Sequence, residues 1–438
     1  METLESLLKR FAEEISSLSL TRYFHPRLGD LADPRAVVIP SVSPSASTKL
    51  PLDRSLILHV TITGRCNARC AGCINVSLTC EGRQDALRLF EADPQREALG
   101  LLALAKRFPR QKVVVAFYGG EPFLEPAKLE AICRFLRRSE EGPRFRFMVY
   151  TNGTLIHRVL EKHPDLLSQL WLVSFSVDGR KEQHERFRRG TNLDRIHANM
   201  ALLRRNAPHT KVLLWSTLRE KQSLRDCVEE FVTLYEKGWV DYFFYHFAET
   251  DAPFEDFSRY LRRYEEDFAF LLQLYIDYLK EGRIFPLIHL NELLAYILTG
   301  YRRGHTACGA ELATNFDLVG GKILACADLP PSLALGEITS QGEVRLHTQD
   351  LSPLAAYREY LPCRECGIEP YCGGRCPVQA LTGSVERTLQ YCQLLRLHVG
   401  MVLERLGEIK ALLSRYHLSP SQLYLEAGYL ARYTDVIP

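Results

Sequence analysis

Three cysteines fall within eight positions of the chain, in the segment TGRCNARCAGC at residues 63–73. They are Cys66, Cys70 and Cys73. A tetrahedral zinc site uses four ligands and a disulfide uses two, so three thiols on one short loop match neither by themselves. The spacing therefore predicts a metal site with one position left open, and the fold must place this loop where a further ligand can reach it.

The bulk properties are those of an ordinary globular protein, with 438 residues, 13 cysteines and a formal net charge of +2. The start, METLESLLKRFAEEISSL, has no secretory apolar region, and no apolar run reaches the roughly 18 residues of a membrane span. We therefore expect a cytoplasmic protein with neither nucleic acid nor a membrane as partner. Because cytoplasmic thiols stay reduced, bound metal or iron–sulfur clusters explain the cysteines better than disulfides do.

Ten of the cysteines form two groups along the chain. The second group consists of Cys308, Cys326, Cys363, Cys366, Cys372, Cys376 and Cys392. Cys133 and Cys227 lie in helical patterns, where a small buried apolar residue is the simplest interpretation. We interpret Cys80 in the same way.

Six short apolar runs alternate with amphipathic stretches between about residues 55 and 247. Near-continuous apolar, β-branched and aromatic runs are typical of strands covered on both faces. The expected strands are 56–63, 112–118, 146–152, 171–177, 211–217 and 240–247. Their alternation with helices predicts an α/β fold of parallel strands joined by right-handed crossovers, either an open sheet or a full or partial barrel.

Short polar motifs follow the ends of four of these strands. The cysteine loop follows the first expected strand, and GGEP (119–122), TNGT (151–154) and SVDG (176–179) follow the next three. Because parallel strands end at one edge of a sheet, and sites in such folds lie at that edge, all four motifs are expected on one rim.

A CxxxCxxC loop directly after the first strand of an α/β barrel resembles that of the radical S-adenosylmethionine (SAM) enzymes. In that family the three thiolates hold a 4Fe–4S cluster whose open iron is chelated by SAM. The reduced cluster cleaves SAM to a 5′-deoxyadenosyl radical that takes a hydrogen atom from the substrate. The resemblance implies a partial (β/α)6 barrel of TIM type. A zinc loop that borrows a distant ligand such as His59 is the alternative.

The other rim motifs resemble the segments that contact SAM in this family. By this resemblance Gly119 and Gly120 let the backbone approach the cofactor, and Glu121 pairs with the SAM ammonium group. Ser176 would contact the ribose or the carboxylate, and Arg188 would pair with the carboxylate.

Two more rim residues, Thr151 and Asn152, are expected as neighbours of SAM, whereas Asp178 is expected to form a turn. One position departs from the family: Gly72 stands where an aromatic residue near adenine is usual. We expect adenine to be packed differently here.

The C-terminal cysteines resemble the SPASM extension of radical SAM enzymes, which houses two auxiliary 4Fe–4S clusters. Cys308, Gly321 and Cys326 read as C-x12-G-x4-C, followed by C-x2-C-x5-C-x3-C and a last cysteine. The resemblance assigns Cys363, Cys366, Cys372 and Cys392 to a distal cluster and Cys308, Cys326 and Cys376 to a proximal one. The segment CRECGIEPYCGGRC could alternatively be a zinc ribbon.

The proximal group is one thiolate short. Some family members carry an eighth cysteine shortly after the first, but this stretch of the chain reads GAELATNF. The proximal cluster would then be open to substrate, or capped by Glu311, Asp328 or His305.

The sequence divides into four expected parts. Residues 1–50 read as a helix followed by a Pro/Ser-rich arm. The rest comprises a radical SAM partial barrel with a helical linker at 51–300, a SPASM domain at 301–400 and a C-terminal helical extension at 401–438.

The resemblance implies a radical SAM oxidoreductase that modifies a peptide or protein side chain, as in the biosynthesis of ribosomally made peptides. Thioether or carbon–carbon cross-links are the expected products, and a flavodoxin- or ferredoxin-type protein the expected electron donor. The alternatives are formylglycine formation as in anaerobic sulfatase maturation, a small-molecule or cofactor-biosynthesis dehydrogenase, and a non-enzymatic electron carrier.

The sixth expected strand carries polar and aromatic groups, namely Tyr242, Tyr245 and His246. They could line a substrate cavity. Core packing is the simpler interpretation of this stripe.

Overall fold

A computed structural model of the chain describes residues 3–18, 37–41, 49–74, 90–347, 350–361 and 363–434. Cys80 and most of the Pro/Ser-rich arm lie outside these ranges. Within the described residues no helix combines the length and the apolar character needed to cross a membrane.

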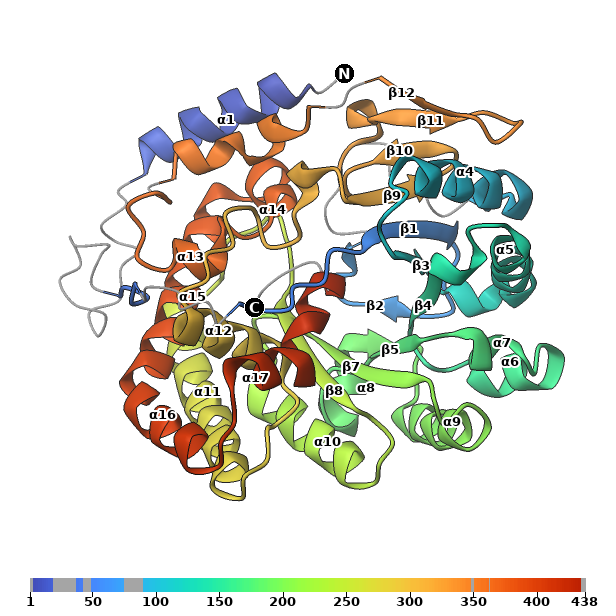
Figure 1. Cartoon of the computed structure of the whole chain (residues 1–438). Helices are drawn as coiled ribbons and strands as arrows, with labels where there is room; N and C mark the ends of the chain where they lie inside the picture. Colours follow the sequence, from blue (N-terminus) through green and yellow to red (C-terminus); the bar gives the residue numbers. More distant parts are fainter. Residues whose placement is uncertain are drawn as a thin grey trace.

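Six parallel strands form the centre of the molecule, in the hydrogen-bonded order β1-β3-β4-β5-β7-β8 (Figure 1). They are β1 (Leu56–Thr63), β3 (Val113–Gly119), β4 (Phe145–Thr151), β5 (Leu172–Ser176), β7 (Lys211–Leu218) and β8 (Tyr242–Phe247). Each overlaps the strand expected from the sequence. The expected α/β fold, a partial (β/α)6 barrel, is confirmed.

Helices cover the outer face of these strands (Figure 1). In α4 (Pro94–Arg107) the Asp93 side chain accepts hydrogen bonds from the N–H groups of Gln95 and Arg96, and proline occupies the first helical position. Both features favour a helix start there. The others are α5 (Pro126–Arg138), α6 (Ile156–Lys162), α7 (Leu166–Gln169), α8 (Lys181–Phe187), α9 (Leu193–Asn206) and α10 (Leu224–Glu236).

The side chains of each strand alternate between the helix-covered face and the barrel interior. Inward positions near the strand starts are apolar, and they pack together in one cluster that includes Ile57, Val114, Met148, Leu172 and Leu213. Further along the same inward rows stand polar or aromatic residues: His59, Tyr118, Tyr150, Ser176, Thr217 and His246. The strand period therefore sends these six side chains toward one end of the barrel.

The last described residues fill the barrel interior. The 3-10 helix η9 (Gly428–Tyr433) places Leu430, Ala431 and Tyr433 in the cluster that lines the strand starts. The Tyr433 ring meets Trp171 edge-on at 5.1 Å between ring centroids. This C-terminal segment is thus part of the barrel core.

The cysteine-rich segment extends the barrel sheet. β9 (Asn315–Val319) pairs in parallel with β1, and β10 (Lys322–Leu324), β11 (Gly336–Ile338) and β12 (Val344–Leu346) follow in antiparallel order. Gly320 and Gly321 join β9 to β10 with φ angles of 62° and 79°. A two-residue hairpin turn with both φ angles positive favours glycine at both positions, which is the structural reason for the glycine in C-x12-G-x4-C.

Further helices surround this extension. α11 (Phe257–Lys280) and α12 (Ile288–Thr299) follow β8, and α1 (Leu4–Ser17) packs in a small cluster with residues of the C-terminal segment. The remaining helices are α13 (Glu369–Cys372), α14 (Pro377–Thr382), α15 (Val385–Glu404), α16 (Leu406–Arg415) and α17 (Pro420–Glu426). The shorter 3-10 helices are η4 (Pro122–Leu124), η5 (Gly142–Arg144), η6 (Ala310–Leu312), η7 (Pro331–Leu333) and η8 (Ser352–Glu359).

Candidate functional site

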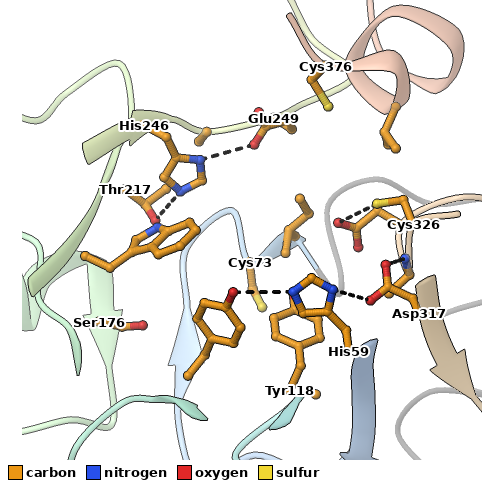
Figure 2. Close-up of a pocket in the computed structure, with 18 of the residues that line it drawn as sticks. His59, Cys73, Tyr118, Ser176, Thr217, His246, Glu249, Asp317, Cys326 and Cys376 are labelled. Atoms are coloured by element: carbon orange, nitrogen blue, oxygen red, sulfur yellow. Dashed lines mark hydrogen bonds and ion pairs between the residues drawn. The ribbon is translucent and has the colours of Figure 1, made fainter. Parts of the chain in front are cut away.

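A cavity of about 240 Å³ lies at the carboxyl ends of the barrel strands. Cys66, Cys70 and Cys73 line it, and so do three cysteines of the C-terminal segment. Figure 2 shows one cysteine of the first loop, Cys73, together with Cys326 and Cys376. The sequence-predicted residues on its wall are Gly119, Gly120, Thr151, Asn152, Ser176, Arg188, Cys308, Cys326 and Cys376. Groups separated by more than 300 positions in the sequence therefore meet in one space.

The first cysteine loop is tied to the segment that carries Arg188. The short strands β2 (Arg69–Cys70) and β6 (Arg188–Arg189) pair antiparallel, with Cys70 opposite Arg188. The Ala71 N–H also donates to the carbonyl of Phe187 at 2.8 Å. The backbone thus fixes Arg188 beside the second and third cysteines.

The donor set of this loop fits an iron–sulfur cluster better than a zinc ion. Three thiols face one cavity. A 4Fe–4S cluster or a structural zinc ion accepts four protein ligands, so the loop leaves one position open. The alternative zinc ligand, His59, places Nδ1 3.1 Å from Asp317 Oδ1. Across the described ranges, no group of three or more His, Cys, Asp or Glu side chains is arranged to hold a single metal ion.

Gly119 and Gly120 allow the end of β3 to approach the base of the cysteine loop. A Cβ on Gly119 would lie 2.4 Å from the Thr63 carbonyl oxygen, and one on Gly120 would lie 2.1 Å from that of Arg65. This close approach is held by two backbone hydrogen bonds. The Gly120 N–H donates to the Thr63 carbonyl oxygen at 2.8 Å, and the Glu121 N–H donates to the Arg65 carbonyl oxygen at 2.9 Å. Any larger side chain would push the two segments apart.

The Glu121 side chain lies behind this contact and is not on the cavity wall. Its carboxylate accepts hydrogen bonds from the Thr151 hydroxyl and the Asn152 N–H, both at 2.8 Å, and from the Phe123 N–H at 3.1 Å. Burial raises the pKa of the Glu121 carboxyl to about 7, although these hydrogen bonds oppose the rise. In this arrangement Glu121 joins the end of β3 to the end of β4.

The TNGT motif reaches the cysteine loop through side-chain amides. The Asn152 amide donates to the Asn67 side chain at 2.8 Å, and the Asn67 amide donates to the Thr154 hydroxyl at 2.8 Å. Asn67 follows directly after Cys66, so this pair of hydrogen bonds holds the first cysteine against β4.

Asp178, expected only to form a turn, is a buried carboxylate between two arginines. Its Oδ2 lies 2.8 Å from Arg188 Nε and 2.7 Å from Arg219 Nη1, and its Oδ1 accepts from the Thr217 N–H at 2.9 Å. Burial disfavours its ionised form, but the two guanidinium groups hold the pKa of Asp178 well below its usual range. The sequence interpretation missed both this role and Arg219.

Arg219 lies on the cavity wall beside Gly72, the position that departs from the family pattern. A Cβ on Gly72 would lie 3.5 Å from Arg219 Nε, and that nitrogen donates to the Ala71 carbonyl. Its location directly after β7 was the available signal, because it is the same rim position that the other motifs occupy.

The three proximal cysteines come from different turns of the C-terminal segment. Cys308 precedes η6, Cys326 follows β10 and Cys376 caps α14. Asp328 lines the cavity with Oδ2 3.9 Å from Cys326 Sγ. The two other proposed caps do not line it: Glu311 accepts from the Thr306 N–H at 2.7 Å, and His305 Nδ1 lies 2.7 Å from the Thr306 carbonyl.

The four distal cysteines form a second group, away from the cavity wall. Burial, followed by the nearby thiols of Cys392, Cys372 and Cys366, raises the pKa of the Cys363 thiol. Arg396 on α15 donates to Cys366 Sγ at 3.3 Å. These four thiols therefore lie close to one another in the structure.

Two single cysteines and the polar and aromatic stripe on β8 were also interpreted from the sequence. Cys133 and Cys227 are fully buried, as expected. On β8 the inward and outward faces differ: Tyr245 is buried in the core, whereas His246 lines the cavity. Core packing thus explains only part of this stripe.

Residues 60–223 match the family model described as the Radical SAM superfamily. Together with the partial barrel and the cysteine loop after β1, this match identifies a radical SAM domain in residues 60–223. No curated protein matches the chain at a significant level.

Two similar solved structures are a histidine-tagged anSMEcpe with bound AdoMet and native anSMEcpe with bound AdoMet and Cp18Cys peptide, both with 18% identity and a TM-score of 0.63. The matches cover 85% and 82% of this chain and 98% and 99% of those chains. Streptococcus suis SuiB bound to precursor peptide SuiA matches with 15% identity and a TM-score of 0.47, over 77% of this chain and 76% of that one. The two anSMEcpe structures therefore share the fold of this chain over most of its length.

Proposed function

We propose that this radical SAM enzyme oxidatively modifies a side chain of a peptide or protein. One observation carries the proposal: a single cavity has the SAM-type cysteine loop on one wall and the three proximal cysteines on another. A substrate held there would lie between a radical source and an electron acceptor. A two-electron oxidation needs both, because one hydrogen atom and one further electron leave the substrate.

The residues of the first wall would hold the cluster and SAM. Cys66, Cys70 and Cys73 would bind three irons of a 4Fe–4S cluster. Arg188 would pair with the SAM carboxylate and Ser176 would contact the carboxylate or the ribose. When bound together, a reduced cluster and SAM supply a 5′-deoxyadenosyl radical that removes a hydrogen atom from the substrate.

Backbone and amide groups complete this proposed SAM site. Gly119 and Gly120 would present backbone to the cofactor, with Thr151 and Asn152 beside it. The Glu121 carboxylate accepts three hydrogen bonds behind the glycines. We therefore propose that Glu121 positions this segment and does not contact the SAM ammonium group directly.

The C-terminal cysteines would form a SPASM domain with two auxiliary 4Fe–4S clusters. The close grouping of Cys363, Cys366, Cys372 and Cys392 supports a fully ligated distal cluster. Cys308, Cys326 and Cys376 would hold the proximal one, and Asp328 lines the same cavity as these three cysteines. An external flavodoxin- or ferredoxin-type protein would reduce the SAM cluster.

A peptide substrate is supported by a similar structure, native anSMEcpe, which has AdoMet and the Cp18Cys peptide bound. For this chain the product we propose is a cross-link such as a thioether or carbon–carbon bond. Formylglycine formation and small-molecule dehydrogenation are outcomes that the experiment must separate.

The test begins with the anaerobically reconstituted protein. We expect about twelve irons per chain, as three 4Fe–4S clusters require, and 5′-deoxyadenosine that forms only with a reductant such as dithionite. Cysteine- and serine-containing peptides are then screened by mass spectrometry for a loss of two hydrogens or for the mass change of formylglycine.

The control for the SAM site is the triple variant C66A/C70A/C73A. It should lose 5′-deoxyadenosine formation and retain about eight irons in the auxiliary clusters. Cleavage of SAM by this variant would refute the assignment of the loop. About four irons in the wild type, with zinc at the C-terminal cysteines, would refute the auxiliary clusters.

A further inference from the structure

A hydroxyl, an imidazole and a carboxylate stand in line on the cavity wall without a role in the proposed cofactor sites (Figure 2). Thr217 ends the inward row of β7 and His246 that of β8, while Glu249 follows β8. His246 Nε2 lies 2.9 Å from the Thr217 hydroxyl oxygen, and its Nδ1 lies 3.5 Å from Glu249 Oε2.

The neighbours of this group favour one position for the proton of the His246 imidazole. Arg188 Nη2 donates to the Thr217 oxygen at 3.3 Å, so the Thr217 hydroxyl hydrogen is available to His246 Nε2. The Glu249 carboxylate can only accept when ionised, so its charge 3.5 Å from Nδ1 favours the imidazole proton on that nitrogen. Nε2, which faces the Thr217 hydroxyl, is then the basic atom.

The carboxylate behind the imidazole is buried beside a guanidinium group and near the proximal Cys376. Glu249 is 4% exposed, and burial by itself would raise its pKa. The His246 imidazole and the Arg375 guanidinium, whose Nη2 lies 3.3 Å from Glu249 Oε1, outweigh burial and lower the pKa below its usual value. A fixed negative charge at this place stabilises an imidazolium when Nε2 accepts a proton.

The other groups around His246 hold its ring without taking the basic nitrogen. The ring meets Trp215 edge-on at 5.3 Å and stacks with Phe244 at 6.0 Å between centroids. The charged or titratable neighbours are Glu249 on its own segment, Arg188 through Thr217, Arg375 behind Glu249, and the buried His289 of α12.

The second imidazole of the cavity is arranged differently. His59 Nδ1 faces Asp317, and its Nε2 lies 3.4 Å from the Tyr150 hydroxyl. That hydroxyl donates to the Tyr433 carbonyl at 2.8 Å, so its hydrogen is not directed at His59. Only the His246 group therefore has a hydroxyl that can pass a proton from the cavity to an imidazole.

We propose that Thr217, His246 and Glu249 form a proton relay that accepts the proton released by the substrate during its oxidation. The inference rests on the proposed function and narrows it to substrates whose reacting side chain carries an S–H, O–H or N–H group. Thr217 and His246 would act directly in proton transfer, and Glu249 would position and stabilise the imidazole.

The proposed reaction balances in atoms and electrons. One hydrogen atom leaves a substrate carbon in the abstraction that radical SAM chemistry supplies. The heteroatom proton passes through Thr217 to His246 Nε2. Cys308, Cys326 and Cys376 would hold an oxidised iron–sulfur cluster, which would supply the acceptor for the one remaining electron. A carbon–heteroatom bond, single in a thioether or double in an aldehyde precursor, takes the place of the C–H and heteroatom–H bonds.

The first test needs no substrate. In the reconstituted, oxidised protein labelled with 15N-histidine, the resonances absent from H246Q identify His246, and nitrogen shifts distinguish its tautomers. We expect the proton on Nδ1, with Nε2 shifted in T217V and Nδ1 shifted in E249Q. A proton on Nε2, or shifts unaffected by both variants, would overturn the relay.

The second test measures how much peptide is modified for each SAM that is cleaved. It uses any peptide that the mass-spectrometry screen identifies as a substrate. The ratio of modified peptide to 5′-deoxyadenosine should fall about 100-fold in H246Q, the lower range for loss of a general base. T217V should also lower it, with T217S restoring part of the loss. The control is H197Q, because His197 makes a similar pair with Glu230 at 2.6 Å on outer helices.

The outcomes separate the two proposals. An unchanged ratio in H246Q, or an equal fall in H197Q, would refute the relay while leaving peptide modification intact. If no peptide is modified, the proposed function fails, and the histidine tautomer still decides whether the hydrogen-bonded relay exists.

Discussion

The Asp178 carboxylate shows how one residue can organise two walls of a site. It is fully buried and pairs with both Arg188 and Arg219. Both arginines also contact the cysteine loop, one by strand pairing at Cys70 and the other through the Ala71 carbonyl. Removal of this single negative charge therefore leaves two buried cations next to the loop without compensation.

We expect D178N to lower the free energy of unfolding by about 3–5 kcal/mol, the usual cost of breaking a buried ion pair. Urea denaturation of the anaerobic protein measures it. The matched control is D194N, because Asp194 pairs with Lys181 at the surface and should contribute about 0–1 kcal/mol. Equal effects of the two substitutions would refute the role of Asp178.

Glu121 gives a pH dependence of the opposite sign to that of a salt-bridged acid. Its folded-state pKa is raised to about 7 by burial, so folding favours the protonated form. The stability it contributes is present at low pH and is lost as the pH rises through 7. Between pH 6 and 8 we expect a loss of about 1.4 kcal/mol from this group.

The measurement is the slope of unfolding free energy against pH in wild type and in E121Q, which has no ionisable group there. We expect a flatter slope in E121Q. The exposed Glu161 supplies the control, and E161Q should keep the wild-type slope. A steep slope in E121Q would show that Glu121 is ionised throughout.

At the scale of elements, the position of the cysteine loop depends on the end of β3. The loop has little regular structure of its own, and it is held by backbone hydrogen bonds to Gly120, Glu121 and Phe187. These contacts explain why the glycine pair and the cysteines occur together at one rim: the glycines leave the space into which the base of the loop fits.

G120A should therefore displace the loop, because the added Cβ would lie 2.1 Å from the Arg65 carbonyl oxygen. We expect a loss of about four irons from the reconstituted protein, corresponding to one 4Fe–4S cluster, together with loss of 5′-deoxyadenosine formation. G407A is the control, since nothing lies within 4 Å of a Cβ at Gly407. Full iron content in G120A would contradict the close approach.

At the scale of the whole molecule, the C-terminal segment packs into the barrel and contacts the residues just before β1. The Tyr433 hydroxyl donates to Asp53 at 2.6 Å, just before β1, and Leu430 is fully buried among the strand starts. Arg432 donates to the carbonyls of Cys308 and Thr314 at 3.2 and 2.9 Å. The C-terminal segment thus links the barrel interior to the segment that carries the proximal cysteines.

Leucines five positions apart give a matched test of this link. We expect L430A to cost about 2–5 kcal/mol of unfolding free energy, as for other buried leucines. L425A should stay within about 0.5 kcal/mol of wild type, because Leu425 is 57% exposed. If L430A were as mild as L425A, the segment would not be part of the core.

The sequence by itself determined the features that depend on local pattern. Strand and helix periods predicted all six parallel strands, since burial on both faces leaves continuous apolar runs. Cysteine spacing predicted the first loop as a metal site, whereas the division of the C-terminal cysteines into groups of four and three came from the family resemblance. The rim placement of GGEP, TNGT and SVDG followed from the common direction of parallel strands.

Tertiary structure decided what depends on contacts between distant segments. That β9 extends the barrel sheet, that Asp178 joins Arg188 to Arg219, and that His246 stands between Thr217 and Glu249 are all pairings across many residues. Sequence period gives the face of each side chain but not its partner on another strand. The side chain that a buried charge meets is fixed only when strand order, register and the packed C-terminal segment bring the two together.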